Sequence, residues 1–115
     1  MRSSDQVVAL IEQDELLAEI VRRLVDAYNP LRVYLFGSRA RGDFGPDSDY
    51  DIMVVVPDSA PTAQRRSRLA YQVLWGLRSA GDILVWTEGQ FARSSHLRSS
   101  LPGTVLREGR LLHAA

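Results

Sequence analysis

Residues 33–56 read VYLFGSRARGDFGPDSDYDIMVVV, and this stretch decides the fold. Its first four residues, Val33–Phe36, are apolar, and they run directly into Gly37 and Ser38. An apolar run bounded by a turn residue is typical of a buried β-strand. The segment 39–48 is rich in Gly, Asp, Pro and Ser, and we therefore expect a loop there.

A second strand follows the loop. The run from Tyr50 to Val56 is rich in β-branched residues and stops at Pro57. Asp49 and Asp51 lie at its start, and side chains two positions apart share one face of a strand. Two like charges at this spacing repel each other, so we expect a compensating cation. Oxygen ligands without cysteine or clustered histidine suit Mg²⁺ or Mn²⁺; the alternative is that both acids only cap a turn over 46–48.

The flanking segments complete an α/β pattern. Apolar spacing predicts one amphipathic helix from Ser3 or Ser4 to Tyr28, ended by Pro30. Beyond the second strand we expect a helix over 61–79 that Gly81 ends, a strand over 82–86 that opens with Asp82, a helix over 88–96, helical structure from about 102 to 108 and a last strand over 110–113. This order predicts one domain, residues 1–115, with a single mixed β-sheet of about four strands covered by helices.

Composition narrows the class of protein. The 115 residues include no cysteine, which excludes disulfides and thiolate chemistry. Acids near the N-terminus argue against a signal peptide, and no apolar run approaches the ~20 residues of a membrane span; we expect a cytoplasmic protein without membrane contact. Arginines and acids balance at 14 each, yet residues 1–60 carry a net charge of −5 and residues 61–115 one of +5. The second half could therefore face an anion.

The two strands and their loop together contain a specific motif. Gly37 and Ser38 lie at the end of one strand, and Asp49 and Asp51 follow after ten intervening residues, giving the pattern G-S-x(10)-D-x-D. A glycine there lets the backbone approach a phosphate, and a serine adds a hydroxyl donor. The chain resembles the minimal nucleotidyltransferase (MNT) domains of the DNA polymerase β superfamily, and the similarity covers most of its length.

The resemblance implies a polymerase β-like core that transfers AMP from ATP to an acceptor hydroxyl with two Mg²⁺ ions. By the family's pattern, Asp49 and Asp51 hold both ions, and Asp82 is the third carboxylate, which helps to hold the catalytic metal and to activate the nucleophile. Gly37 and Ser38 would hold the triphosphate. From residue chemistry alone, Arg39 and Arg41 could also reach phosphate oxygens, although solvated loop arginines explain them equally well.

As a small chain of this family type, the protein resembles the antitoxin half of HEPN/MNT toxin-antitoxin pairs. The resemblance implies a HEPN ribonuclease toxin as partner and a tyrosine of that toxin as the acceptor. Two alternatives stay open: an antitoxin that neutralises its partner by binding alone, and a nucleotidyltransferase that acts on a small molecule or an RNA 3′ end. We expect no stable nucleic-acid binding, and the chain could form homo- or hetero-oligomers.

Overall fold

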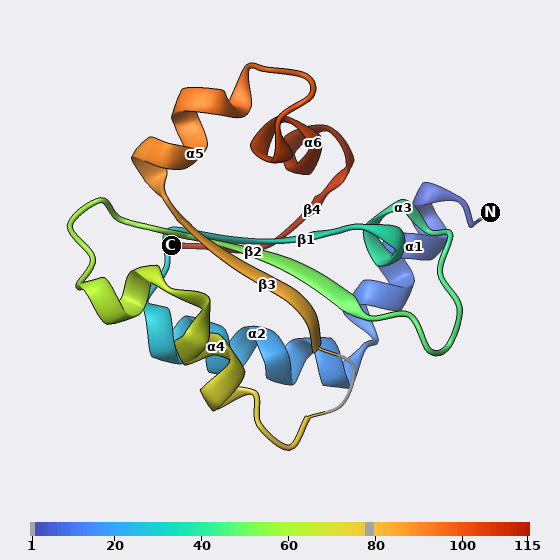
Figure 1. Cartoon of the computed structure of the whole chain (residues 1–115). Helices are drawn as coiled ribbons and strands as arrows, with labels where there is room; N and C mark the ends of the chain where they lie inside the picture. The colour runs from blue at the N-terminus through green and yellow to red at the C-terminus, as the bar shows by residue number, and fades with distance from the viewer. Residues whose placement is uncertain (1, 78–79) are drawn as a thin grey trace.

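A computed structural model describes residues 2–77 and 80–115, and it confirms the α/β prediction of one mixed four-stranded sheet. The strands lie in the order β3-β2-β1-β4 (Figure 1). The central strand β1 is antiparallel to both of its neighbours, whereas β2 and β3 are parallel. Their bounds are β1 Arg32–Phe36, β2 Tyr50–Val56, β3 Ala80–Thr87 and β4 Arg110–Ala114.

Helices cover both faces of the sheet. In Figure 1, α2 and α4 lie below it and α5 and α6 above it, while α1 and α3 lie together at one end. None of the helices in the described segments is long and apolar enough to cross a membrane. The helical elements are α1 Ser4–Glu12, α2 Glu15–Tyr28, α3 Ser38–Arg41, the 3-10 helix η1 Thr62–Arg65, α4 Ser67–Val73, α5 Glu88–Ser95 and α6 Leu101–Glu108.

The strand β2 supplies side chains to two cores because successive side chains point to opposite faces. Ile52 and Val54 pack against α2 and α4. Met53 and Val55 join the second cluster, which contains Phe91 of α5. All the residues of β2 from Ile52 to Val56 are fully buried, so the strand that follows Asp49 and Asp51 lies in the core of the protein.

The prediction of one continuous first helix is wrong. The chain forms α1 and α2 separately, and Asp14 lies at the junction in an extended conformation. Its carboxylate accepts a hydrogen bond from the N–H of Leu17 at 3.0 Å, which caps α2. The other carboxylate oxygen accepts a hydrogen bond from the hydroxyl of Tyr50. The break in the helix therefore ties α2 to the start of β2.

Two further sequence-based boundaries need correction. The segment predicted as a helix over 61–79 contains η1 and the shorter α4, which ends at Val73; residues 78 and 79 lie outside the described part of the chain. Gly81 does not end a helix but lies in β3, because this strand begins two residues earlier than predicted. The segment 39–48 is also not all loop, since α3 takes up its first residues.

Tyr28, the last residue of α2, holds the start of α4 in place. Its hydroxyl accepts a hydrogen bond from the N–H of Ala70 at 2.8 Å and donates one to the carbonyl of Arg66. Burial raises the pKa of this hydroxyl, so it remains a donor at neutral pH. The N-cap residue of α4, Arg66, makes no side-chain capping hydrogen bond, and the hydroxyl of Tyr28 serves in its place by bonding the main chain of the first turn.

We expect Asp14→Ala to lower the free energy of unfolding by about 1–3 kcal/mol, because it removes a helix cap and leaves the Tyr50 hydroxyl without its carboxylate. Urea denaturation measures the change. Glu15→Ala, at an exposed neighbouring position, is the matched control and should change stability much less. Equal effects of the two substitutions would contradict the role assigned to Asp14.

Candidate functional site

Three acidic residues meet at one end of the sheet. β1 ends there and β2 starts there, because the two strands are antiparallel and Phe36 lies opposite Asp51. β3 starts at the same end, because it is parallel to β2. Asp49 directly precedes β2, and Asp82 is the third residue of β3. The fold therefore brings Asp82 to the same end of the sheet as Asp49 and Asp51, although it lies more than thirty positions further along the chain.

A β-bulge adjusts the position of Asp82. Tyr50 pairs with Ala80, but Ile52 pairs with Ile83, so two residues of β3 lie opposite Asp51 alone. Bulges of this type redirect side chains and are frequent next to active sites. Here the N–H of Asp82 donates a hydrogen bond to Oδ1 of Asp51 at 3.3 Å. The bulge thus joins the third acid directly to the second.

Two glycines make room for the carboxylate of Asp51. A Cβ on Gly37 would overlap Oδ2 of Asp51, and a Cβ on Gly81 would lie 3.1 Å from Oδ1 and 2.7 Å from Cβ of Asp49. Gly37 also has φ 72° and ψ −158°, a conformation that is essentially restricted to glycine. Both glycines are therefore required by the acids, and neither is replaceable by a larger residue without moving them.

The acids interact electrostatically. Burial raises the pKa of Asp51, and the negative charges of Asp82 and Asp49 raise it further; the N–H of Asp82 and the positive charge of Arg41 act in the opposite direction. Asp49 and Asp82 are exposed, so their side chains face water. The folded chain thus keeps mutually repelling acids close to Asp51, and perturbed pKa values of this kind are common at functional sites.

The donor set fits a divalent cation in its chemistry. Carboxylate oxygens are the ligands that Mg²⁺ and Mn²⁺ prefer, and a cation would relieve the repulsion around Asp51. Within residues 2–77 and 80–115, no three acidic or histidine side chains are already gathered as a ligand cluster. Exposed side chains rotate between rotamers at little cost, so Asp49 and Asp82 can turn toward a cation beside Asp51.

Gly37, Ser38 and Arg41 lie close to these acids. Gly37 precedes the short helix α3, and its carbonyl accepts the N–H groups of Ala40 and Arg41, both at 3.1 Å. Ser38 is the first residue of α3. The guanidinium of Arg41 contacts the carboxylate of Asp43 at 3.3 Å while its charge acts on Asp51. The predicted phosphate-binding residues Gly37, Ser38 and Arg41 are therefore adjacent to the acids.

Arg39 is held elsewhere. Its guanidinium lies over the rings of Tyr50 and Phe44, at 4.2 and 4.8 Å from the ring centroids, and Nε donates to the carbonyl of Ser48 at 2.8 Å. Tyr50 points to the face of β2 opposite to Asp51 and is buried. These contacts organise the loop before β2, and a role of Arg39 in nucleotide binding stays a prediction.

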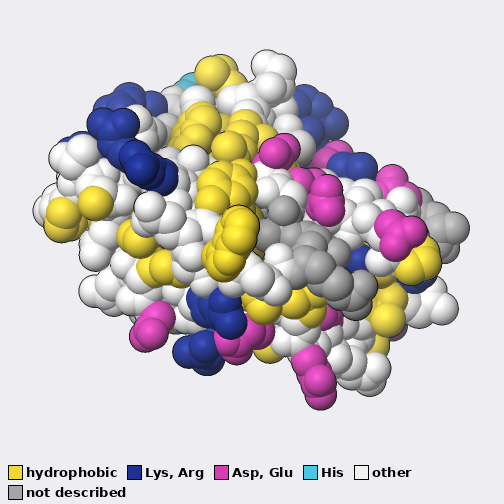
Figure 2. Space-filling view, turned by 60° about the horizontal axis from the view of Figure 1, so that its bottom comes forward, with side chains coloured by type: hydrophobic (Ala, Val, Ile, Leu, Met, Phe, Trp, Pro, Cys, Tyr) yellow, Lys and Arg dark blue, Asp and Glu magenta, His cyan; other side chains and the backbone are white. Residues whose placement is uncertain are grey.

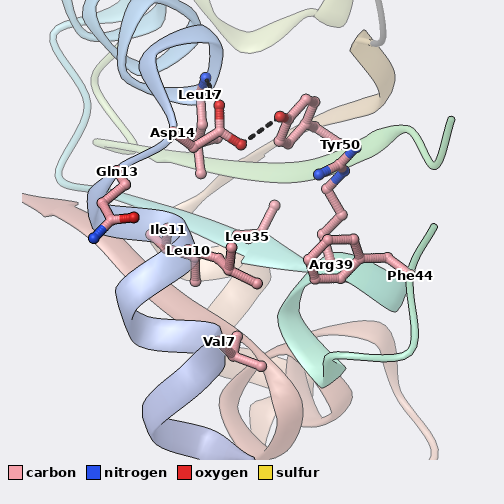
Figure 3. Close-up of a pocket in the computed structure, with 10 residues that line it drawn as sticks. All are labelled: Val7, Leu10, Ile11, Gln13, Asp14, Leu17, Leu35, Arg39, Phe44 and Tyr50. Carbon is pink, nitrogen blue, oxygen red and sulfur yellow. Dashed lines mark hydrogen bonds between the residues drawn. The ribbon is translucent and has the colours of Figure 1, made fainter. Parts of the chain in front are cut away.

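A cavity of about 280 Å³ lies beside this arginine, between the α1–α2 junction and the sheet (Figure 3). Tyr50 and Asp14 point toward each other across one of its walls, and Leu10 and Ile11 form the opposite, apolar side. The cavity is separated from Asp51 by the thickness of the sheet, since Tyr50 lines it. It is therefore a feature of the helix junction and not part of the acidic site.

An acidic triad at the open end of a mixed sheet, beside a Gly-Ser turn, defines a phosphoryl-group or nucleotidyl-group transfer class of protein. The family described as "Nucleotidyltransferase domain" matches residues 15–108, and the chain belongs to this family. The match covers α2 through α6, which includes every acid and glycine of the site. A comparison with curated proteins gives no significant match.

Solved structures show the same fold. One is a protein from Sulfolobus solfataricus classed as a nucleotidyltransferase, which has 25% identity, a TM-score of 0.57 and coverage of 96% of this chain and 87% of its own. A mutant of the toxin-antitoxin pair MntA-HpeT has 25% identity and a TM-score of 0.58, and the match covers 85% of this chain and 73% of that one. A toxin-antitoxin structure with AMP-PNP has 26% identity and a TM-score of 0.55, and the match covers 84% of this chain and 73% of that one.

Gly81 is the site residue that the sequence-based interpretation missed. A glycine after a helical pattern is a typical helix end, and the same residue is needed here beside Asp49 and Asp51. The signal in the sequence is its position directly before Asp82, the acid that opens an apolar run. Tyr71 of α4 supports this segment, because its hydroxyl accepts the N–H of Ile83 at 3.2 Å and lies 3.4 Å from the carbonyl of Gly81.

Gly37→Ala should lower the free energy of unfolding by about 1–3 kcal/mol, because alanine at this φ is strained and its methyl group displaces the Asp51 carboxylate. Chemical denaturation checks this value. Gly45→Ala is the matched control, since a Cβ there meets nothing within 4 Å. A stable Gly37→Ala protein would show that the close approach to Asp51 is not needed.

Asp51→Asn should raise the melting temperature at pH 7, because burial and the neighbouring acids disfavour the charged form of the wild-type carboxylate. Because the pKa of Asp51 is higher in the folded than in the unfolded protein, the free energy of unfolding of the wild type falls as the pH rises above the ordinary pKa of Asp. Below that pH the carboxyl is protonated in both states, so the difference in melting temperature between Asp51→Asn and the wild type should vanish. Thermal melts across this pH range measure the difference. Asp47→Asn, at an exposed loop position, is the control, and a lower melting temperature for Asp51→Asn would contradict the electrostatic account.

Proposed function

We propose that this chain transfers AMP from ATP to the hydroxyl of a tyrosine on a partner toxin of the HEPN ribonuclease class, and thereby acts as the antitoxin. The observation that carries the proposal is the carboxylate of Asp51, which is held between Gly37 and Gly81 with Asp49 and Asp82 beside it. Membership in the nucleotidyltransferase family supports the chemistry. The toxin-antitoxin structures, one of them with AMP-PNP, support the biological role.

The residues have separate tasks in this proposal. Asp49 and Asp51 would hold two divalent ions, which neutralise charge on the phosphates and align the reacting oxygens when bound. Gly37 and Ser38 bring backbone and hydroxyl donors to the triphosphate, and Arg41 adds a positive charge at its edge. Together these residues orient the α-phosphate toward the open end of the sheet, where the acceptor arrives.

Asp82 is assigned to the acceptor side. The hydroxyl oxygen of the acceptor attacks the α-phosphorus, the bond between this phosphorus and the bridging oxygen of the β-phosphate breaks, and pyrophosphate leaves. The proton of the hydroxyl passes to the carboxylate of Asp82, which is exposed and therefore accessible to an acceptor from outside. The product is an AMP ester of the acceptor, and no further reactant is needed.

A macromolecular acceptor agrees with the architecture. The helices α2, α4, α5 and α6 cover the faces of the sheet, and the described chain has no additional lobe at the end where the acids lie (Figure 1). A tyrosine on the surface of a partner can bring its own binding surface. AMP on a tyrosine adds bulk and negative charge, which would oppose RNA binding at a ribonuclease site.

Two other functions compete with this one. A small molecule or an RNA 3′ end could be the acceptor in the same chemistry, and the chain could also neutralise its partner by occlusion alone. The specific arrangement around Asp51 disfavours occlusion alone, because binding would not need an electrostatically unfavourable acidic group between two glycines. Identifying the molecule that gains AMP distinguishes a protein acceptor from a small molecule or an RNA 3′ end.

Incubation of the chain with Mg²⁺, ATP and the protein encoded beside it should increase the partner's intact mass by whole AMP units. The double variant Asp49→Asn/Asp51→Asn should lose this transfer by at least about a thousandfold, since removing the ligands of the metal ions removes most of the charge stabilisation. Intact-mass spectrometry follows the reaction, and peptide mapping identifies the modified residue.

The control is Asp5→Asn/Asp26→Asn, which makes the same charge change at exposed positions in α1 and α2. It should transfer AMP at the wild-type rate. A partner that the Asp49→Asn/Asp51→Asn protein still neutralises, with no change in mass, would establish occlusion and reject the catalytic proposal. AMP found on RNA instead of the protein would retain the chemistry and replace the acceptor.

A further inference from the structure

The outer edge of β3 pairs with no other strand in the described part of the chain, although the hydroxyl of Tyr71 accepts the N–H of Ile83 and the side chain of Gln90 accepts that of Thr87. β3 lies at the end of the strand order and pairs with β2 along its inner edge. The strand from Ile83 to Thr87 contains no charged side chain. Proteins normally protect such an edge with charges on the strand, a proline or a covering element, because unpaired N–H and C=O groups attract another strand. The uncharged stretch of this edge between the two bonded groups, Leu84–Trp86, is therefore a candidate binding surface.

Two hollows flank this edge. One, of about 620 Å³, lies between β3 and the start of α4, and the other, of about 420 Å³, lies between β3 and α5. Val85, Trp86 and Arg65 line both. Because α4 and α5 cover opposite faces of the sheet, the hollows lie on the two sides of the same edge (Figure 1). An added strand would point successive side chains into one hollow and then the other.

The hollows are strongly basic. Arg65, Arg66 and Arg68 line the first and Arg93 lines the second. All four arginines are exposed, and none of them forms an ion pair within the described residues. Figure 2 shows one cluster of basic side chains at the upper left, separated by hydrophobic side chains from the acidic ones beside the grey segment. Like charges gathered without counter-charges favour an anionic ligand.

We propose that the outer edge of β3 binds an extended acidic segment of a partner protein, which adds to the sheet as a fifth strand between these arginines. Its main chain pairs with Leu84–Trp86, and its carboxylates reach Arg65, Arg66 and Arg68 on one side and Arg93 on the other. Binding by strand addition takes affinity from the backbone and specificity from alternate side chains.

The main-chain groups along Leu84–Trp86 favour a polypeptide over a nucleic acid. A second strand satisfies the N–H and C=O groups of an edge at the strand repeat, whereas a polynucleotide has no matching row of groups. Trp86 is partly buried against the second core cluster and so does not present a free ring for base stacking. The zero net charge of the chain also differs from that of a general nucleic-acid binder.

This surface is separate from the acidic site. Asp82 and Trp86 are four positions apart in β3, a span of about 13 Å at the usual strand rise. Peptide binding needs neither ATP nor the acids, so it can be tested without the proposed transfer reaction. Failure of one proposal therefore leaves the other standing.

Fluorescence anisotropy with a labelled octapeptide of sequence EEVVEEVV tests the surface, because its glutamates point to both faces of an extended strand. We expect Arg65→Glu/Arg68→Glu to raise the Kd at least about tenfold, as expected when charge-assisted contacts are replaced by repulsion. Arg98→Glu, at an exposed position that lines neither hollow, should leave the Kd within about twofold of wild type.

Two probes distinguish strand addition from general attraction between charges. The QQVVQQVV peptide should bind more weakly, because its amides carry no charge. A fully N-methylated EEVVEEVV peptide keeps its charges and loses its main-chain donors, so it should not bind measurably. Equal affinity of the methylated peptide would overturn strand addition, and tighter binding of a labelled oligouridylate, lost in Arg65→Glu/Arg68→Glu, would assign the surface to RNA and overturn the proposal.

Discussion

The carboxylate of Asp51 is packed against main chain on both sides, and this contact constrains much of the molecule. Gly37 can approach it because β1 ends in a turn that only glycine adopts. Gly81 can approach it because a bulge places an extra residue of β3 opposite the strand. The mixed sheet, the turn and the bulge are thus linked by one side chain, and the negative charge that they enclose is the same one that a cation would neutralise.

A second set of contacts stabilises this end of the sheet on the face that packs against α2. Asp14 lies between α1 and α2, caps α2 and accepts a hydrogen bond from the hydroxyl of Tyr50, whose ring supports Arg39. Tyr50 lies between the two acids in sequence and on the opposite face in space. The residue between Asp49 and Asp51 therefore anchors the strand so that the acids keep their position in spite of mutual repulsion.

Local patterns predicted the strands well and the long-range contacts poorly. The bounds of β2 follow from its β-branched run and Pro57, and the proximity of Asp49 to Asp51 follows from strand alternation. The break at Asp14 was missed because apolar spacing continues through it, and its cause is the distant Tyr50. The place of Gly81 depends on the register between β2 and β3, which no local pattern contains.

The strand order also affects how the chain is made. β1 pairs with β2, which follows it closely, and with β4, which lies near the end of the sequence. During synthesis one edge of β1 therefore stays uncovered until β4, which follows the other three strands, has left the ribosome, and such edges invite pairing with other chains. A nascent chain of this protein is most exposed to aggregation just before β4 emerges, at a stage when its future acidic site is already complete in sequence.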